Sequence, residues 1–285
     1  MSIRLLRPER TDQVSVALAE GRALAGGTDL LVQRRDGAPV DTMVDLSSLA
    51  DAPAPVTETM MDGRPAVRLS AVAPLTLVAA GVRGRFASLT DAEAVFASEQ
   101  IRNRATIGGN LATGSPGADT VPALLAAGAV IDLLGPEGSR HVPIEQFLLG
   151  PRRVDLRPGE WVRTVTAPLP SLVSGFRKVG GRRALAISFL SLAWQWHVDD
   201  GGRLRDVRLA MGAVAPTVVR LRHAEALLEG AVATSDVVAS AARAVGADIA
   251  PIDDLRASAT YRRTAAAGLL AEVLLSTTTP KEEDR

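Results

Sequence analysis

The segment from Ile101 to Thr120 constrains the fold of this chain more than any other. It is rich in Gly, Ser, Thr and Asn and is long for a plain connection. Connections of this length inside a compact domain are usually functional or disordered. The segment follows a predicted helix at Asp91–Ser98 and precedes a predicted short helix at Pro122–Ala127 and a strand at Val130–Leu134. We therefore predict an ordered loop that binds a ligand.

The residues of this segment suit a phosphate or a sugar. Gly108 and Gly109 can present backbone N–H groups, and the carboxylate of Asp119 can accept hydrogen bonds from ribose hydroxyls. The side chains that can hydrogen-bond phosphate or ribose oxygens are those of Thr106, Asn110, Thr113 and Ser115. The alternative is a solvated surface loop, which the density of hydrogen-bonding side chains disfavours.

A second glycine-rich segment lies near the N-terminus. There Ala25-Gly26-Gly27-Thr28-Asp29-Leu30-Leu31 separates a predicted strand from a predicted helix. Glycine lets the backbone approach a ligand closely, and the start of a helix offers unpaired N–H groups. This arrangement favours a pyrophosphate. Alternatively, the segment is only a tight turn in which Thr28 caps the helix, because a glycine motif alone is weakly specific.

The pattern around this second segment predicts a small α/β unit. Short strands at Ile3–Leu6, Arg22–Ala25 and Thr42–Asp45 alternate with helices at Thr11–Ala19 and Asp29–Arg35. We place this N-terminal unit at residues 1–55 and a middle α+β unit at residues 56–173.

The C-terminal third, residues 174–285, has a different pattern. Strands are predicted at Gly175–Val179, Phe189–His197 and Leu204–Met211, and Asp200-Gly201-Gly202 is a hairpin signal between the last two. Helices follow at Arg222–Leu228, Ser235–Val245 and Thr260–Leu275. This order predicts an α+β domain in which a three-stranded antiparallel sheet carries helices on one face.

Composition excludes several classes of function. The chain has 32 acidic and 32 basic residues and only 3% aromatic residues, which disfavours a nucleic-acid partner. It has no cysteine, so it cannot hold a thiolate zinc site or a cysteine-ligated iron–sulfur cluster. The longest apolar stretch, Val121–Leu134, is too short to span a bilayer. We expect a cytoplasmic protein without integral membrane contact.

The few candidate catalytic residues have simpler interpretations. His141, His197 and His223 lack metal-ligand spacing. Trp194 and Trp196 share one face of a strand and are predicted to be core or interface residues rather than catalytic ones. We assign no catalytic and no metal-binding residue.

The motifs together resemble the FAD-binding (medium) subunits of the xanthine dehydrogenase and carbon monoxide dehydrogenase family of molybdenum hydroxylases. Ala25–Leu31 resembles the first FAD motif of the family, and Thr106–Asn110, continued through Ser115-Pro116 to Asp119, resembles the second. Three more segments resemble the flavin-side Lys and Arg cluster, the start of the helical part of the C-terminal domain and the entry to its last helix: Phe176-Arg177-Lys178 with Arg182-Arg183, Gly212–Thr217 and Ser258–Arg263. One departure is Ala186, where the family usually has Asp.

The resemblance covers nearly the whole chain and implies an α+β fold with a two-part FAD-binding region. In that fold a small α/β unit and a larger α+β unit hold FAD between them, and the C-terminal domain packs beside the flavin. Lys178, one of two lysines in the chain, would offer a compact ammonium group to the flavin side, although a plain lysine on a strand surface is the alternative. The residues that motif and resemblance assign to FAD binding are Ala25, Gly26, Gly27, Thr28, Asp29, Leu30, Ile101, Thr106, Ile107, Gly108, Gly109, Asn110, Thr113, Ser115, Asp119 and Lys178.

The resemblance also implies partner chains. An iron–sulfur small subunit would carry [2Fe–2S] clusters, and a large subunit would carry molybdopterin, in a dimer of heterotrimers. Electrons would pass from the clusters through FAD to NAD or another acceptor. Two alternatives remain: a free-standing FAD-dependent oxidoreductase that acts on a small organic substrate without molybdenum, and a scaffold subunit whose FAD site has decayed.

Overall fold

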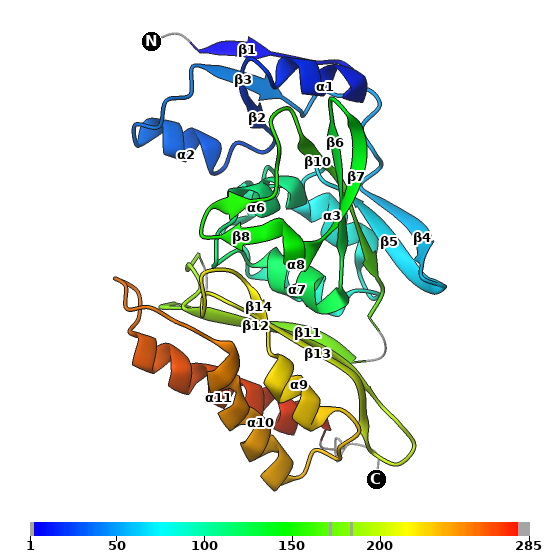
Figure 1. Ribbon diagram of the computed structural model, residues 1–285, viewed down its shortest axis with the longest axis vertical. Helices are drawn as coiled ribbons and strands as arrows, with labels where there is room; N and C mark the ends of the chain where they lie inside the picture. The colour runs from blue at the N-terminus through cyan, green and yellow to red at the C-terminus, as the bar shows by residue number, and fades with distance from the viewer. Residues whose placement is uncertain (1–2, 171–172, 183–184, 279–285) are drawn as a thin grey trace. The chain divides into compact units, whose positions relative to one another are not determined.

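A computed structural model of the chain describes residues 3–170, 173–182 and 185–278 (Figure 1). The chain forms two compact units that are interleaved along the sequence. The first unit consists of Met1–Arg85, Phe96–Ser115 and Gly128–Leu169, and the second of Phe86–Val95, Pro116–Ala127 and Pro170–Arg285. We describe each unit by itself.

The first unit begins with the predicted α/β arrangement. Strands β1 (Arg4–Leu6), β2 (Arg22–Leu24) and β3 (Thr42–Asp45) form a parallel sheet in the order β1-β3-β2, joined by helices α1 (Thr11–Ala17) and α2 (Leu30–Arg35). Parallel neighbours need crossover connections, which explains the helix after each of the first two strands. Val14 of α1 and Val44 of β3 are fully buried and pack in one cluster with Trp161.

The rest of the first unit is built on an antiparallel sheet. Its strands follow the order β4-β5-β10-β6-β7 and span Val56–Met61, Arg64–Ser70, Trp161–Pro168, Val130–Gly135 and Gly138–Pro143. The same unit contains helices α3 (Leu75–Val82) and α8 (Ile144–Phe147) and a small hairpin of β8 (Leu148–Gly150) and β9 (Arg153–Val154).

The glycine-rich segment from 101 to 120 is not a continuous loop. It contains α5 (Glu99–Arg102) and α6 (Ile107–Thr113) and leads into α7 (Thr120–Ala127). The side chains of Ser98 and Thr106 accept hydrogen bonds from the first turns of α5 and α6, and Gly114, with φ of +59°, ends α6. Residues that favour caps also favour loops, so the sequence pattern did not separate the two. Because Ile107 and Leu111 of α6 are fully buried, the alternative of a solvated surface loop is wrong.

The second unit contains the C-terminal sheet. Strands β11 (Val173–Val179), β12 (Leu190–Val198) and β13 (Leu204–Gly212) are antiparallel, as predicted. The expected count of three strands is wrong, because β14 (Val219–Arg220) pairs with β13 as a fourth strand. Two residues are too few to show an alternating pattern, so β14 could not be predicted from the sequence.

Helices cover this sheet on both faces rather than on the one face expected. Helices α9 (Arg222–Leu228), α10 (Ser235–Asp248) and α11 (Ala259–Thr278) lie on one side, and α7 lies against β12 and β13 on the other (Figure 1). Helix α4 (Ala87–Ala94) packs on β11 and α7. The two helices α4 and α7 come from the middle of the chain, so the sequence order alone did not place them here.

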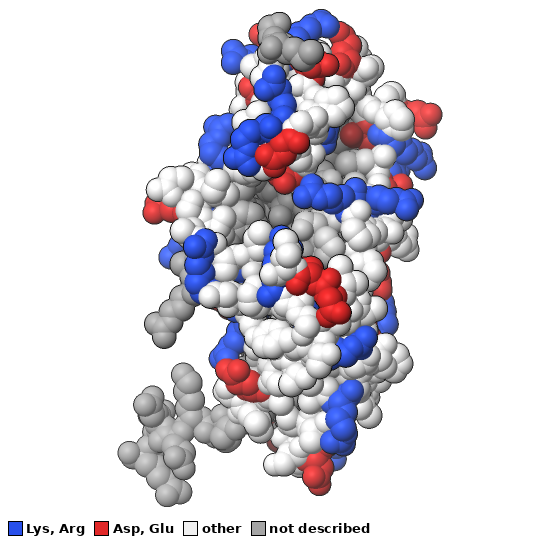
Figure 2. All heavy atoms as spheres, turned by 90° about the vertical axis from the view of Figure 1, so that its left-hand side faces the viewer, with Lys and Arg blue, Asp and Glu red and all other residues white. Residues whose placement is uncertain are grey.

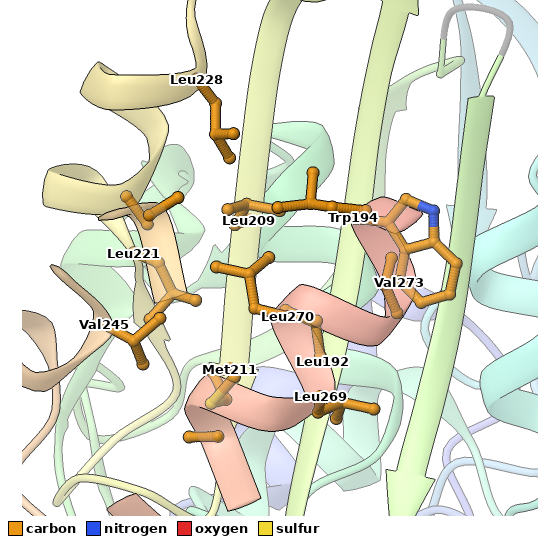
Figure 3. Packing of buried hydrophobic residues seen from close by; sticks show 14 of the residues in the cluster. Leu192, Trp194, Leu209, Met211, Leu221, Leu228, Val245, Leu269, Leu270 and Val273 are labelled. Atoms are coloured by element: carbon orange, nitrogen blue, oxygen red, sulfur yellow. The ribbon is translucent and has the colours of Figure 1, made fainter. Parts of the chain in front are cut away.

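The core of the second unit lies between the sheet and the last helices. Figure 3 shows Trp194 and Leu209 on neighbouring strands, facing Leu270 and Val273 of α11. Trp194 and Trp196 are buried, which confirms their prediction as core residues, and their rings stack with centroids 6.4 Å apart. Burial of a large apolar side chain stabilises a fold by about 1.5–3 kcal/mol, so this cluster gives the second unit a core of its own.

The charged side chains are mixed in sign. Figure 2 shows basic and acidic groups lying in small patches of both signs on one face of the molecule, with uncharged surface between them. Within the described part of this face there is no continuous basic stripe of the kind that tracks a nucleic-acid backbone.

Candidate functional site

The first unit brings the two glycine-rich segments together. A Cβ on Gly26 would lie 2.0 Å from the carbonyl oxygen of Arg104, so only glycine permits this close approach of the two backbones. Thr113 Oγ1 donates a hydrogen bond to the carboxylate of Asp29 at 3.3 Å. Segments some 80 residues apart in the sequence therefore form one site, as their separate interpretations required.

The first segment presents a row of backbone donors. The N–H groups of Gly26, Gly27, Thr28 and Asp29 donate no hydrogen bond to any residue that the structure describes. Gly27 has φ of +75°, and all four residues are half-buried. Successive unpaired N–H groups can bind an anion, so this loop has the kind of donors that a pyrophosphate requires. Helix α2 has Asp29 rather than Thr28 at its N-cap, with no side-chain cap bond, so the simple capping alternative for Thr28 is wrong.

The carboxylate of Asp29 is held by three neighbours. Gln33 Nε2 donates a hydrogen bond to Asp29 Oδ2. The hydroxyl of Thr113, which also donates to the carbonyl of Gly109 at 2.9 Å, lies 3.3 Å from the same carboxylate oxygen. Arg152 Nη1 lies 3.8 Å from it. The side chain of Asp29 therefore links α2, α6 and the β8–β9 hairpin.

The two glycines of the second segment have different environments. Gly108 donates its N–H to the carbonyl of Ala71 at 2.9 Å, and a Cβ there would lie 2.7 Å from that oxygen. Gly109 donates its N–H to Thr106 Oγ1 at 3.0 Å. The expectation that both N–H groups are presented to a ligand is therefore wrong. A Cβ on Gly109 would meet only Thr106 Oγ1, at 3.1 Å, and this leaves one side of Gly109 open.

The other predicted residues of these segments also lie in the first unit. Ala25, Leu30, Asn110 and Ser115 are half-buried, and Ile101 is 36% exposed. Thr106 and Ile107 are buried within the protein, where Thr106 serves as the N-cap of α6.

Asp119 and Lys178 lie in the second unit and form a buried ion pair. Lys178 Nζ is 2.6 Å from Asp119 Oδ2, and each side chain is 8% exposed, which rejects the alternative of a surface lysine. Ser188 Oγ donates to Asp119 Oδ1 at 2.7 Å, and Lys178 also donates to the carbonyl of Val95 at 3.3 Å. Burial raises the pKa of Asp119 above its ordinary value, although the charge and hydrogen bond of Lys178 act in the opposite direction. Ser188 was not identified from the sequence, because a lone serine before a strand carries no signal.

The arginines near Lys178 are engaged within the second unit. Arg177 pairs with Glu272 of α11, and Arg182 donates to the carbonyl of Leu185 at 2.6 Å. Arg183 lies outside the described residues.

No group of three or more His, Cys, Asp or Glu side chains among the described residues is placed to hold a metal ion. None of their helices combines the length and the apolar character that crossing a membrane requires.

Comparison with known proteins gives consistent matches over nearly the whole chain. Residues 1–170 match the family model described as the FAD binding domain in molybdopterin dehydrogenase, and residues 176–277 match that of the CO dehydrogenase flavoprotein C-terminal domain. The xanthine dehydrogenase FAD-binding subunit of Escherichia coli O157:H7 is 31% identical over 85% of this chain and 84% of its own length. The carbon monoxide dehydrogenase medium chain of Hydrogenophaga pseudoflava is 32% identical over 68% of each chain.

Solved structures agree with these matches. A chain of carbon monoxide dehydrogenase from Hydrogenophaga pseudoflava superposes with a TM-score of 0.88 at 28% identity, and covers 98% of this chain and 97% of that chain. A chain of quinoline 2-oxidoreductase from Pseudomonas putida 86 gives a TM-score of 0.86 at 25% identity, with the same coverage of 98% and 97%.

Proposed function

Since the chain belongs to the FAD-binding flavoprotein subunits of the xanthine dehydrogenase and carbon monoxide dehydrogenase family of molybdenum hydroxylases, we propose that it positions one FAD for electron transfer between partner chains and an acceptor. The observation that carries the proposal is that one unit contains both the four successive unpaired N–H groups from Gly26 to Asp29 and the open side of Gly109. FAD supplies the redox chemistry when it is bound, and the protein supplies binding and orientation.

The roles proposed for individual residues follow from their geometry. The N–H groups of Gly26, Gly27, Thr28 and Asp29 would hold the pyrophosphate. Gly108 and Thr106 would hold the backbone of this site in place, because both residues are buried and hydrogen-bonded within the protein. The place of a residue in the two motifs assigns to the cofactor Ala25, Leu30, Ile101, Ile107, Asn110, Thr113, Ser115 and Asp119. Lys178 is assigned by its place in the segment that resembles the flavin-side Lys and Arg cluster.

The electron path needs partner chains. This chain has no cysteine, so thiolate-ligated [2Fe–2S] clusters must reside on another chain, which we take to be an iron–sulfur small subunit. Molybdopterin would reside on a large subunit, and NAD or another acceptor would receive the electrons. We propose a cytoplasmic dimer of heterotrimers, in which the arginine-rich segment from Arg177 to Arg183 contributes to docking. Names of relatives such as "medium chain" support a multi-subunit assembly.

We further propose three structural parts at residues 1–55, 56–173 and 174–285. The sheets support this division. The sheet of β1–β3 falls in the first part and the sheet of β4, β5, β6, β7 and β10 falls in the middle part. The sheet of β11–β14 falls in the last part, apart from Val173 at the start of β11. The small hairpin of β8 and β9 falls in the middle part.

We expect one FAD per chain, bound without a covalent link. The absence of cysteine removes one route of covalent attachment. Acid denaturation of the purified protein should release flavin that chromatography identifies as FAD, at a stoichiometry of about one. Release of FMN, or of no flavin from well-folded protein, would contradict the assignment of the glycine segments to a dinucleotide.

We expect the isolated chain to be unable to hydroxylate an organic substrate. When it is supplied with reduced nicotinamide and a dye, it should at most reduce the dye. Turnover of purines or aldehydes should appear only after the iron–sulfur and molybdenum subunits are added. Robust turnover by the isolated chain would instead establish the free-standing flavoenzyme.

A further inference from the structure

The tip of the β8–β9 hairpin carries an arginine in a strained conformation. Arg152 has φ of +55°, in the left-handed region that residues other than glycine seldom adopt. Its N–H donates to the carbonyl of Gly114 at 2.8 Å, where α6 ends. Such a conformation costs free energy and persists only where neighbouring structure holds it, often at a functional site.

The ion pair of Arg152 contributes too little to folding stability to offset the cost of this left-handed conformation. Its guanidinium lies 3.8 Å from Asp29 Oδ2, and the two side chains are 64% and 39% exposed. Exposed ion pairs contribute little to folding because water and salt screen them. A glycine at this position would relieve the backbone strain, and the protein would lose little folding stability. Stability therefore does not explain why an arginine side chain stands here.

The position of Asp29, the ion-pair partner of Arg152, indicates what the arginine side chain does. Its N–H is one of the four unpaired donors of the first glycine loop, so its carboxylate belongs to the segment that would receive a pyrophosphate. An unneutralised carboxylate there would repel an anion. Gln33 and Thr113 fix the carboxylate but bring no charge, and Arg152 brings the positive charge.

We propose that Arg152 is a positioning residue for the dinucleotide, which neutralises Asp29 beside the first glycine loop from the tip of the β8–β9 hairpin. This inference rests on the proposed function, because it takes FAD to be the ligand of that loop. It assigns a role in cofactor affinity to a residue outside both glycine motifs.

The test is titration of flavin-free full-length protein with FAD, followed by flavin fluorescence. Arg152→Gln should raise the Kd roughly tenfold, the scale of one modest charge interaction, and this difference should shrink in high salt. Arg152→Lys should recover much of the affinity. Arg152→Gly should weaken FAD binding as Gln does while leaving the unfolding midpoint unchanged or higher. Arg153→Gln is the matched control, since Arg153 is the exposed neighbour in the same hairpin, and it should bind FAD normally.

A double variant distinguishes two ways in which Arg152 can affect FAD affinity: through the charge of Asp29, or through direct contact with FAD. If Arg152 acts by neutralising Asp29, Arg152→Gln combined with Asp29→Asn should bind FAD more tightly than Arg152→Gln alone. Equal loss in the double variant overturns that route, and an unchanged Kd in Arg152→Gln overturns the inference altogether. Failure of the unaltered protein to bind FAD overturns the proposed function itself, a result distinct from FAD binding that ignores Arg152.

Discussion

Gly109→Val should yield folded protein that has lost its flavin, and Gly109→Ala should retain flavin only weakly. Gly109 lies in the first turn of α6, and a Cβ there would meet only the Thr106 hydroxyl, so the fold tolerates a small side chain. Gly109 belongs to the segment that we assign to FAD, so methyl groups on its open side would take space that we assign to the cofactor. We expect FAD affinity to fall at least a hundredfold for Val, about 2.7 kcal/mol. The unfolding free energy should change by only about 1 kcal/mol.

The measurement compares flavin content with thermal unfolding in the same preparations. Gly268→Ala is the matched control, since Gly268 is a helical glycine with nothing within 4 Å of its added Cβ. It should keep full flavin content and gain slight stability. Gly27 is a poorer choice, because its φ of +75° means that any substitution also strains the backbone. Normal flavin content in Gly109→Val would show that this glycine does not border the cofactor.

Lys178→Met should destabilise the second unit strongly. The substitution leaves the Asp119 carboxylate buried, with Ser188 as its remaining hydrogen-bond donor among the residues that the structure describes. Removal of one partner from a buried ion pair costs about 3–5 kcal/mol. Replacement of both partners by apolar residues is far less costly, so Lys178→Met with Asp119→Leu should recover most of the loss. Denaturant unfolding of the three variants measures this coupling.

The loss in Lys178→Met should depend on pH with a definite sign. Burial already raises the pKa of Asp119, and removal of the lysine removes the main influence that lowers it. A carboxyl group whose folded pKa is raised destabilises the fold above that pKa, and the penalty disappears as pH falls through it and the group is protonated. The deficit of Lys178→Met relative to the unaltered protein should therefore shrink in mild acid. A deficit that is constant or grows with acidity would show that Asp119 is not the group left unpaired.

Some of the fold could be predicted because local signals and tertiary structure agree. The strands at 4–6, 22–24 and 42–45 alternate with helices at the predicted places, since short apolar runs broken by glycine have few other solutions. Helices α5 and α6 were missed because Ser98, Thr106 and Gly114 serve as caps, and caps use the same residues as loops. The order β1-β3-β2 and the place of α7 depend on distant contacts that no local pattern encodes.

The candidate site also combines features that the local sequence predicts with features that only distant contacts determine. Gly26 and Gly108 could be predicted as glycines that allow close approach, but the approach was expected to be to a ligand. Their close neighbours are the carbonyls of Arg104 and Ala71, which tertiary packing sets. Asp119 and Lys178 were selected by resemblance, and only the structure shows that they pair with each other. Arg152 had no signal, since left-handed backbone at an arginine cannot be read from its neighbours in sequence.

The interleaving of the two units has a consequence for synthesis of the chain on the ribosome. All eight residues of α7, Thr120–Ala127, are buried, and α7 packs on β12 and β13, which begin only at Leu190. A nascent chain that has emerged as far as residue 170 therefore exposes an apolar helix whose partners have not yet been translated. Exposed apolar surface of this kind invites aggregation or chaperone binding. The span 1–170, although it matches a family model by itself, is thus poorly suited to fold before the rest of the chain arrives.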